Sequence, residues 1–220
     1  ACGPAGATKC HVQDSRGLAP GNNIRIVRPS TKEWIDALGM TEFGGGLGDW
    51  RLVWHPGSRD LVWDRVIQKV EGNLVTVDAP ITTAIEKQLG GGRIETYAWP
   101  GRIENVGVEN LRLESAFDTQ NPKDENHCWF AIKMENDADA WIRQVTFEHF
   151  AGSAVALYES CKQITVEDCL SLAPVSEDAG GRRDTFFTMG QQTLFLRCRS
   201  ENGRHDFATG IFAAGPNAFV

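Results

Sequence analysis

A short apolar phrase recurs along the second half of the chain and limits what the chain can fold into. Its copies are Val106-Val108-Leu111, Val145-Phe147-Phe150 and Ile164-Val166-Cys169, with a weaker copy at Thr193-Phe195-Cys198. Each copy has apolar residues with a period of two, then two further residues, then one more apolar residue. This pattern is typical of a strand that turns a corner and starts another strand. Because the copies are unevenly spaced, we expect one coil per copy with loops of different length, as in a parallel β-solenoid.

A second strand precedes each of the later phrases, at residues 129–134, 154–158 and 185–189. Aligning the three predicts an inward set formed by Ile132, Val155 and Phe187, followed two residues later by Met134, Leu157 and Met189. The outward set is then Ala131, Lys133, Glu135, Ala154, Ala156, Tyr158, Phe186 and Thr188. Stacked coils would place the outward residues in columns along a long shallow groove. A slip of one residue would exchange the two faces.

The first part of the chain has a different pattern. We expect a strand at 23–27, a short amphipathic helix at 32–40 and a hairpin of strands 65–70 and 74–77 joined through Glu71-Gly72-Asn73. Residues 1–100 are therefore expected to form a small β-rich subdomain or insertion with one short helix. Residues 101–220 are expected to form parallel β-helix coils that belong to a longer solenoid, so the fold class is all-β.

Composition excludes some partners. The net charge of −7 and the pI near 5.3 argue against nucleic acid, which requires a basic stripe. No apolar run reaches the roughly 18 residues of a membrane span, and the N-terminus lacks the layout of a signal peptide. Neither end carries a convincing polar cap, so we expect a piece of a longer protein that can self-associate through uncapped solenoid ends.

The cysteines leave two questions open. None of the six forms a C-x-x-C pair, which makes a zinc ribbon improbable. Cys2 and Cys10 can close a small loop if the protein is secreted. Cys169 and Cys198 take the same position in adjacent repeats, about 4.8 Å apart at the strand spacing. They form either a reduced stack or a disulfide.

Two loops concentrate chemically competent side chains. Residues 173–185 hold Glu177, Arg182 and Arg183, and residues 203–210 hold His205 and Asp206. If the loops share one groove, the arginines can hold a sugar carboxylate in a bidentate fork. They can also stabilise the enolate formed beside a uronic acid, and His205 can transfer a proton if Asp206 orients it. In the competing interpretation, the arginines pair with acidic residues of a solvated loop and His205 is a turn residue.

Four further residues are expected to contact substrate: Trp129, Lys133, Tyr158 and Glu177. Trp129 lies on the predicted groove face and can stack on a sugar ring, unless the loop 116–126 covers it. That loop contains three acidic residues but lacks the spacing of an EF-hand, so calcium there is unsupported and we expect no cofactor.

Several stretches resemble a known superfamily: 180–186 (GGRRDTF), 203–207 (GRHDF), 215–219 (GPNAF), 28–35 and 99–103. They are similar to secreted bacterial proteins of the pectate-lyase-like superfamily. This resemblance covers most of the chain. It implies a right-handed parallel β-helix, the pectin-lyase-like solenoid, with a small β-rich insertion in the N-terminal half, located in the secreted or periplasmic space. The superfamily includes polysaccharide lyases, glycoside hydrolases, pectin esterases, epimerases and phage tailspikes, so the fold alone does not select an activity.

The leading hypothesis is an enzyme that cleaves an acidic polysaccharide by β-elimination or hydrolysis in a groove on the β-helix. Arg182 and Arg183 would hold the acidic group, His205 would transfer the proton and Asp206 would orient it. The sequence matches neither the calcium-binding aspartates and catalytic arginine of pectate lyases nor the paired aspartates of polygalacturonases. A second hypothesis is a non-catalytic carbohydrate-binding or adhesin-like or tailspike-like β-helix. A third is a structural fragment whose partners are its own missing coils.

Overall fold

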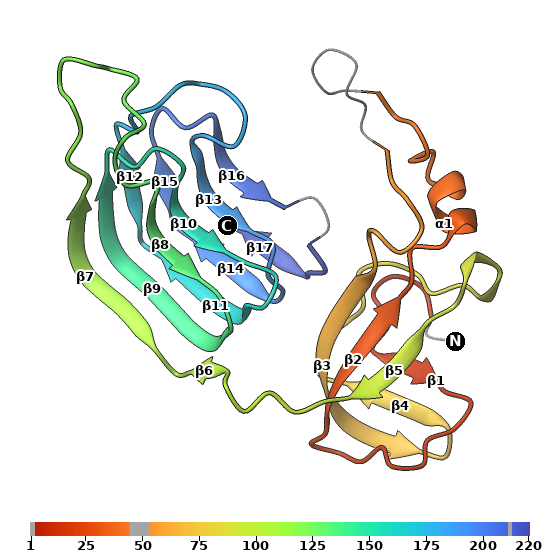
Figure 1. The fold of residues 1–220 in the computed structure, drawn as a ribbon. Helices are drawn as coiled ribbons and strands as arrows, with labels where there is room; N and C mark the ends of the chain where they lie inside the picture. Colours follow the sequence, from red (N-terminus) through yellow and green to blue (C-terminus); the bar gives the residue numbers. More distant parts are fainter. Residues whose placement is uncertain (1–2, 45–52, 211–212) are drawn as a thin grey trace. The chain divides into compact units, whose positions relative to one another are not determined.

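The chain forms two compact units, Ala1–Trp99 and Pro100–Val220, in the computed structural model shown in Figure 1. The structure describes residues 3–44, 53–210 and 213–220. Within these residues, no helix is both long enough and apolar enough to cross a membrane. The two units are described separately below.

The first unit is built on a five-stranded antiparallel sheet in the order β1-β4-β3-β2-β5. Its elements are β1 (Lys9–His11), β2 (Asn23–Arg28), α1 (Lys32–Ala37), β3 (Leu61–Glu71), β4 (Leu74–Val77), η1 (Lys87–Leu89) and β5 (Arg93–Thr96). The order leaves β1 and β5 at the two edges. Ile24, Ile26 and Trp63 are fully buried in its core.

The predicted helix and hairpin of this unit are both present. Helix α1 begins after Thr31, whose Oγ1 accepts a hydrogen bond from the Trp34 N–H at 3.2 Å. The helix ends at Ala37, which is earlier than expected, and Leu38 is exposed rather than packed. Strands β3 and β4 pair through Glu71 and Leu74, with Gly72 at a φ of 57° in the turn.

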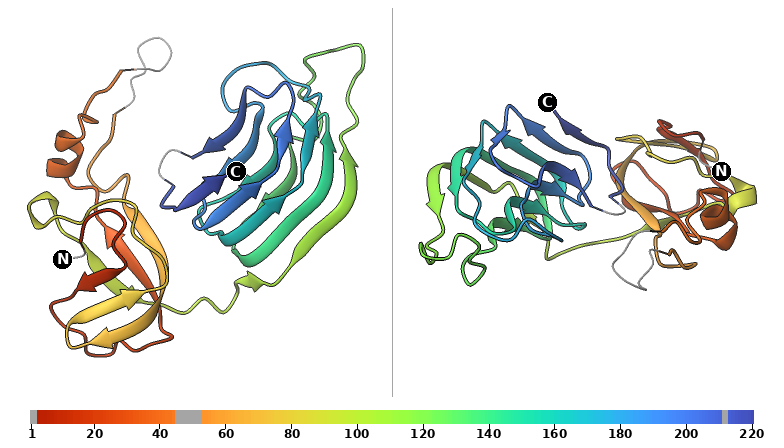
Figure 2. Two further views of the ribbon diagram at one scale, coloured as in Figure 1. Left: turned by 180° about the vertical axis from the view of Figure 1, so that it is seen from behind. Right: turned by 90° about the horizontal axis from the view of Figure 1, so that it is seen from above.

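Among its described residues, the second unit contains strands and no helix, and every strand pair is parallel. They are β6 (Ile103–Glu104), β7 (Gly107–Glu114), β8 (Phe130–Met134), β9 (Asp137–Glu148), β10 (Ser153–Leu157), β11 (Lys162–Glu167), β12 (Leu170–Leu172), β13 (Asp184–Thr188), β14 (Thr193–Leu196), β15 (Arg199–Ser200), β16 (His205–Thr209) and β17 (Asn217–Phe219). Figure 2 shows these strands stacked as successive coils. The predicted all-β fold with stacked parallel strands is confirmed to this extent.

The strands of successive coils form three ladders. The first ladder is a four-stranded sheet in the order β16-β13-β10-β8. The other two ladders share one larger sheet because β9 is long and bends. Its first half pairs with β11 and its second half pairs with β12.

A single backbone device makes each bend. Asn110, Gln144, Asp168 and Arg197 stand at equivalent positions of successive coils and have φ values of 58°, 54°, 53° and 51°. A residue in the left-handed region reverses the alternation of a strand. The chain therefore returns to the inward side three residues after the previous inward residue. This geometry is the physical origin of the apolar phrase.

The prediction that Val145-Phe147-Phe150 is equivalent to Val106-Val108-Leu111 is wrong, because the two copies lie at different corners of the coil. The register pairs Val108 with Ile142 and Ile142 with Val166, so the equivalent second copy is Ala140-Ile142-Val145. The copy Val145-Phe147-Phe150 belongs to the next corner of the same coil, where His149 has a φ of 68°. Both corners use the same device, so both produce the same phrase.

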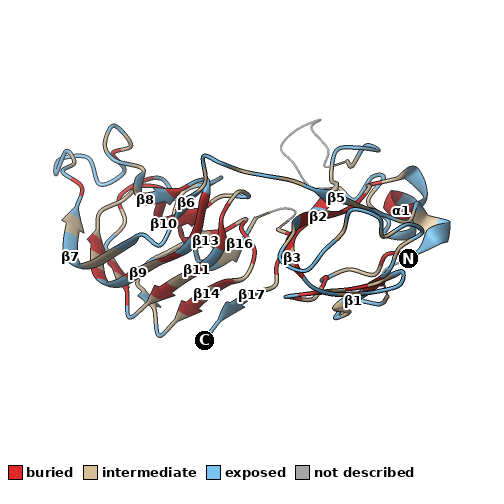
Figure 3. Cartoon of the chain, turned by 90° about the horizontal axis from the view of Figure 1, so that it is seen from below, coloured by how far each residue is buried: buried red, intermediate tan, exposed pale blue. Residues whose placement is uncertain are grey.

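The inward face of the first sheet was predicted correctly in two of its three strands. Val155 pairs with Ile132, and Leu157 pairs with Met134. In β13 the prediction was wrong by one residue: Phe186, expected outside, is fully buried, and Phe187 lies outside. The core also contains Phe147, Ile164, Val166 and Phe195, and Figure 3 shows buried residues on the strands of the coil stack.

The four cysteines of the second unit are free. Val166 pairs in register with Phe195, and Cys169 and Cys198 each follow three residues later. The two thiols therefore form a reduced stack, which was one of the two arrangements expected. The hydrogen bond to Cys198 and burial raise the pKa of the Cys169 thiol. In the first unit, Cys10 is disulfide-bonded, and Cys2 lies outside the described residues.

Candidate functional site

The outward face of the first sheet presents a row of aligned side chains. The register places Lys133 beside Ala156, Ala156 beside Phe187, and Phe187 beside Ala208. Because side chains alternate along a strand, Glu135, Tyr158 and Met189 extend the same face two residues further on. The pairing thus places an aromatic ring on each of two neighbouring coils.

Lys133 and Tyr158 are in contact on this face. The Lys133 Nζ lies 4.6 Å from the centroid of the Tyr158 ring and 2.7 Å from Glu135 Oε1. The hydrogen bond to Glu135 raises the pKa of the Lys133 ammonium. All three groups are at least partly exposed, so a ligand can replace the ion pair at little cost.

The middle of the face is made by small residues. Ala154 and Ala156 point outward from β10 yet are only 2% and 0% exposed. Larger side chains therefore surround and cover them. The face is consequently a packed layer with polar and aromatic groups at its surface, rather than an open row of alanines.

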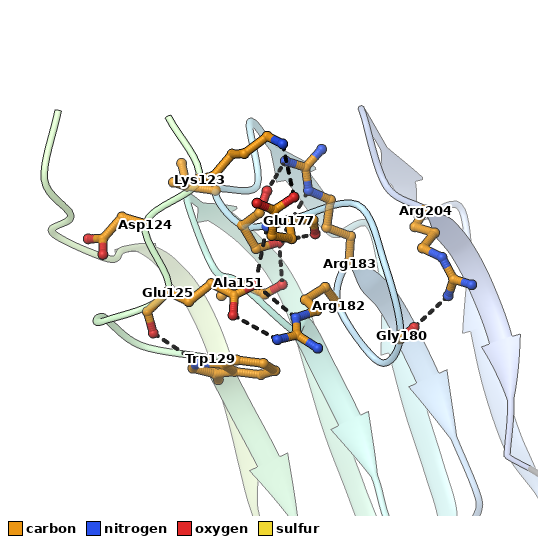
Figure 4. A network of polar contacts seen from close by, with 12 residues as sticks. Lys123, Asp124, Glu125, Trp129, Ala151, Glu177, Gly180, Arg182, Arg183 and Arg204 are labelled. Carbon is orange, nitrogen blue, oxygen red and sulfur yellow. Dashed lines mark hydrogen bonds and ion pairs between the residues drawn. The ribbon is translucent and has the colours of Figure 1, made fainter. Parts of the chain in front are cut away.

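Trp129 lies just before β8, and two loops meet around it (Figure 4). Its indole N–H donates a hydrogen bond of 3.1 Å to the Glu125 carbonyl, and the Arg182 guanidinium lies 5.1 Å from the ring centroid. Arg182 also donates two hydrogen bonds of 2.8 Å to the Glu125 carboxylate. This fork lowers the pKa of Glu125 to about 2.

Glu177 and Arg183 of the loop 173–185 also have partners within the protein. Glu177 Oε2 lies 2.9 Å from Lys123 Nζ, and the Glu177 N–H donates to Glu125. Arg183 donates a hydrogen bond of 2.6 Å to the Ser176 carbonyl. Arg182 therefore joins the loop 173–185 to the loop before β8, and Arg183 bonds within its own loop, whereas the competing interpretation expected both arginines to pair with acidic residues of their own solvated loop.

His205 and Asp206 do not face one another. They are consecutive in β16, so their side chains leave opposite sides of the strand. His205 lies on the side of Phe207, whose ring stacks on Phe186 with centroids 5.4 Å apart. Asp206 lies on the outward side, where both Asp206 Oδ1 and Thr185 Oγ1 would be within 2.6 Å of a Cβ at Gly203.

Asp184 is the carboxylate beside His205. The two residues pair in the register of β13 and β16. Burial raises the pKa of the Asp184 carboxyl, against the opposing influence of His205 and Arg204. The Asp184 Oδ1 lies 3.9 Å from Arg204 Nη1 and is a buried atom without a hydrogen-bond partner in the described part of the chain. The sequence analysis assigns no role to Asp184, because nothing in the sequence distinguishes it from the other charged residues of the loop 173–185.

A second missed cluster joins the same loops. His127 Nδ1 lies 2.8 Å from Ser115 Oγ, and its Nε2 lies 2.9 Å from the Val175 carbonyl. Because the carbonyls of Asp124 and Val175 both lie near Nε2, this nitrogen carries the proton, and Nδ1 accepts a hydrogen bond from Ser115 Oγ. The imidazole fastens the loop before β8 to the loop before β13. No sequence motif connects these positions, and only their spatial contact reveals the cluster.

The acidic loop before β8 uses its carboxylates internally. The Asp124 carboxylate accepts hydrogen bonds of 2.9 Å from the N–H groups of Asp118 and Asn126, which lower its pKa. Glu125 is engaged by Arg182. Over residues 3–44, 53–210 and 213–220, no cluster of three or more His, Cys, Asp and Glu side chains is arranged to hold a metal ion.

Comparison with known proteins adds a structural likeness. No protein-family model matches the chain, and no curated protein matches it. The chain is similar to the tailspike protein gp49 from Pseudomonas phage LKA1, with a TM-score of 0.45 and 13% sequence identity. The match covers 89% of this chain and 27% of that tailspike chain, so this chain spans about a quarter of its length.

Proposed function

We propose that the second unit binds an extended polysaccharide along the outward face of the sheet β8-β10-β13-β16. The observation that carries the proposal is the register, which aligns Lys133, Ala156 and Phe187 on three neighbouring coils, with Tyr158 two residues beyond Ala156 on the same face. Aromatic faces offer large rigid apolar contacts for sugar rings, and the adjacent charged groups can fix their hydroxyls. Trp129 extends the face at the end where the two loops meet.

The bound chain is proposed to be uncharged rather than acidic. The second unit contains 18 Asp and Glu residues against 11 Lys and Arg residues, so it carries the whole net charge of −7. This field repels a polyanion. In addition, Arg182 and Arg183, which were expected to hold an acidic sugar, are committed to Glu125 and Ser176.

Glycan cleavage is a second candidate function, favoured by the pair Asp184 and His205. This pair lies on the Phe186 and Phe207 side of β13 and β16, so cleavage there requires a binding position separate from the outward face. A carboxyl whose pKa is raised by burial can act as a general acid, and a partly exposed imidazole beside it can exchange protons. Arg204 lies close enough to bias the charge on Asp184. The pair of Asp184 and His205 thus takes the place of the expected pair, His205 oriented by Asp206, as the proposed proton-transfer group.

We also propose that the coils close into a right-handed parallel β-helix of the pectate-lyase-like type. The three parallel ladders and the repeated corner residues support closure, and parallel crossovers are almost always right-handed. A location outside the cytoplasm is supported by the disulfide at Cys10. Self-association through the edge strands β16 and β17 is supported by the exposure of Phe207 and Phe219.

A panel of oligosaccharides tests the proposed function. Isothermal titration with neutral and uronic-acid chains of equal length measures binding, and reducing ends with absorbance near 235 nm measure cleavage. Tighter binding of a neutral chain supports the proposal, whereas binding limited to uronic-acid chains would contradict it and support the hypothesis of an acidic substrate. Asp184→Asn should abolish cleavage and keep binding. Product formation unchanged by Asp184→Asn would exclude the proposed acid.

A further inference from the structure

A groove opens in the first unit between the two edges of its sheet. It has a volume of about 790 Å³ and is lined by residues that follow β1 and by all of β5. Ligand sites commonly have about 300–1,000 Å³. The sheet order leaves β1 and β5 as edges, and Figure 1 shows them in the same part of the unit. The groove is therefore a gap in the sheet where a further strand could lie.

The open edge of β5 presents unpaired backbone groups to this gap. The Tyr97 N–H donates a hydrogen bond of 3.2 Å to the Asn23 carbonyl. Since hydrogen-bonded pairs alternate in an antiparallel ladder, Arg93 and Glu95 face β2, whereas Ile94 and Thr96 face the gap. In the described part of the chain, no hydrogen bond satisfies the N–H or the carbonyl of Ile94 or Thr96.

These groups match the backbone of another extended chain. Residues two apart in a strand present their N–H and carbonyl groups about 6.7 Å apart along the same edge. A peptide in the extended form offers donors and acceptors with the same spacing, which is how strand addition to a sheet edge binds peptides. A polysaccharide offers no such regular pair of donor and acceptor.

The side chains of the groove define the peptide further. Val12, Leu18 and Ile94 are partly exposed and contribute apolar surface to the lining, so alternate residues of the peptide should be apolar. Charged groups also line the groove: three cations and two carboxylates, at Asp14, Arg16, Lys87, Arg93 and Glu95. The carboxylates are already paired with Arg16 and Arg93. The lining thus has an excess positive charge, although the whole first unit has 11 Lys and Arg against 11 Asp and Glu.

We propose that this groove binds an extended acidic peptide segment as an additional strand beside β5. Lys87 supplies the cation for an acidic side chain of the peptide, and the backbone of Ile94 and Thr96 supplies the ladder. Binding buries the one open edge of β5 and leaves the pairing between β2 and β5 intact. The site belongs to the first unit, whereas the proposed polysaccharide face belongs to the second unit.

The test uses the full chain and a synthetic eight-residue peptide of alternating valine and glutamate. Two control peptides carry lysine in place of glutamate, or N-methyl groups on alternate amides of one edge. We expect a Kd below about 1 mM for the glutamate peptide and at least about tenfold weaker binding of both controls. Amide exchange at Ile94 and Thr96 should slow when the glutamate peptide binds.

Two substitutions locate the site. Thr96→Pro removes an N–H that has no partner in the free protein and should weaken binding about tenfold, whereas Thr96→Val should not. Lys87→Glu should shift the preference from the glutamate peptide to the lysine peptide. Absence of binding at about 1 mM, equal binding of the N-methylated peptide, or unchanged exchange at Ile94 and Thr96 would overturn the proposal. The exchange measurement uses the unaltered chain, so it decides the question even if Thr96→Pro does not fold.

Discussion

Arg182 and Glu125 are 57 positions apart and join two loops of the second unit through two hydrogen bonds of 2.8 Å. The same guanidinium lies 5.1 Å from the centroid of the Trp129 ring. A planar fork fixes both the distance and the orientation of the pair. The position of Trp129 at the end of the outward face of the sheet β8-β10-β13-β16 therefore depends on a contact between loops that belong to different coils.

Replacing Arg182 by lysine should loosen both loops. An ammonium cannot make the two parallel hydrogen bonds, nor can it lie flat above the indole. We expect limited proteolysis within 173–185 to become several-fold faster while the far-UV circular dichroism of the coils stays unchanged. Arg197→Lys is the matched control, because Arg197 also pairs with two acceptors but away from these loops. Equal acceleration in both variants would contradict a specific role for Arg182.

Lowering the pH should break the contact between Arg182 and Glu125. The fork from Arg182 lowers the pKa of Glu125 to about 2, below the ordinary value of about 4.3. A carboxyl with a lowered pKa stabilises the folded state above its unfolded pKa, and this contribution is lost as the pH falls towards the folded pKa. Fluorescence of Trp129, isolated by comparison with Trp129→Phe, should change between about pH 4 and pH 2. Glu125→Gln should remove this transition, and its persistence in that variant would assign it to another group.

A methyl group at Gly107 should test the register of the first coil. Gly107 pairs with Trp141, and a Cβ at Gly107 would lie 2.0 Å from the indole Cε2. Because the partly exposed Trp141 ring would have to leave its position on the outer side of β9, Gly107→Ala should destabilise the second unit by about 1 kcal/mol. Gly101→Ala is the control, since nothing lies within 4 Å of its added Cβ. Equal urea midpoints for the two variants would contradict the register.

The free thiols should react in a fixed order. Cys128 is exposed, whereas burial raises the pKa of Cys161 to about 11. The thiolate is the reactive form, so Cys161 and Cys169 should resist a thiol reagent at pH 8 until the chain unfolds. Mass spectrometry of the labelled peptides should find Cys128 modified first. Early labelling of Cys161 would show that the core is open.

Much of the second unit could be predicted because its core pattern is local. Ile164-Val166-Cys169 and Thr193-Phe195-Cys198 stand in register as their spacing indicated. The errors came from ambiguous positions. Ala140 is too small to mark an inward position by its type, and both alternations of 185–188 contain one phenylalanine, so β13 fitted either face.

The polar site was harder to predict because its contacts are between distant residues. Nothing near Arg182 in the sequence identifies Glu125 as its partner, and Asp184 differs from Asp206 in being half-buried and in lying on the other side of its strand. Likewise, the side of the strand taken by His205 depends on the register of Phe186 with Phe207. Burial and register arise only when the coils stack.

The most direct test of the polysaccharide face is titration of the double variant Tyr158→Ala/Phe187→Ala with the best neutral oligosaccharide. We expect binding to weaken at least about tenfold, because both rings of the face are lost. The control is Leu194→Ala, which removes a partly buried side chain from β14 in another ladder. An unchanged Kd in the double variant, or an equal loss in Leu194→Ala, would contradict binding at this face.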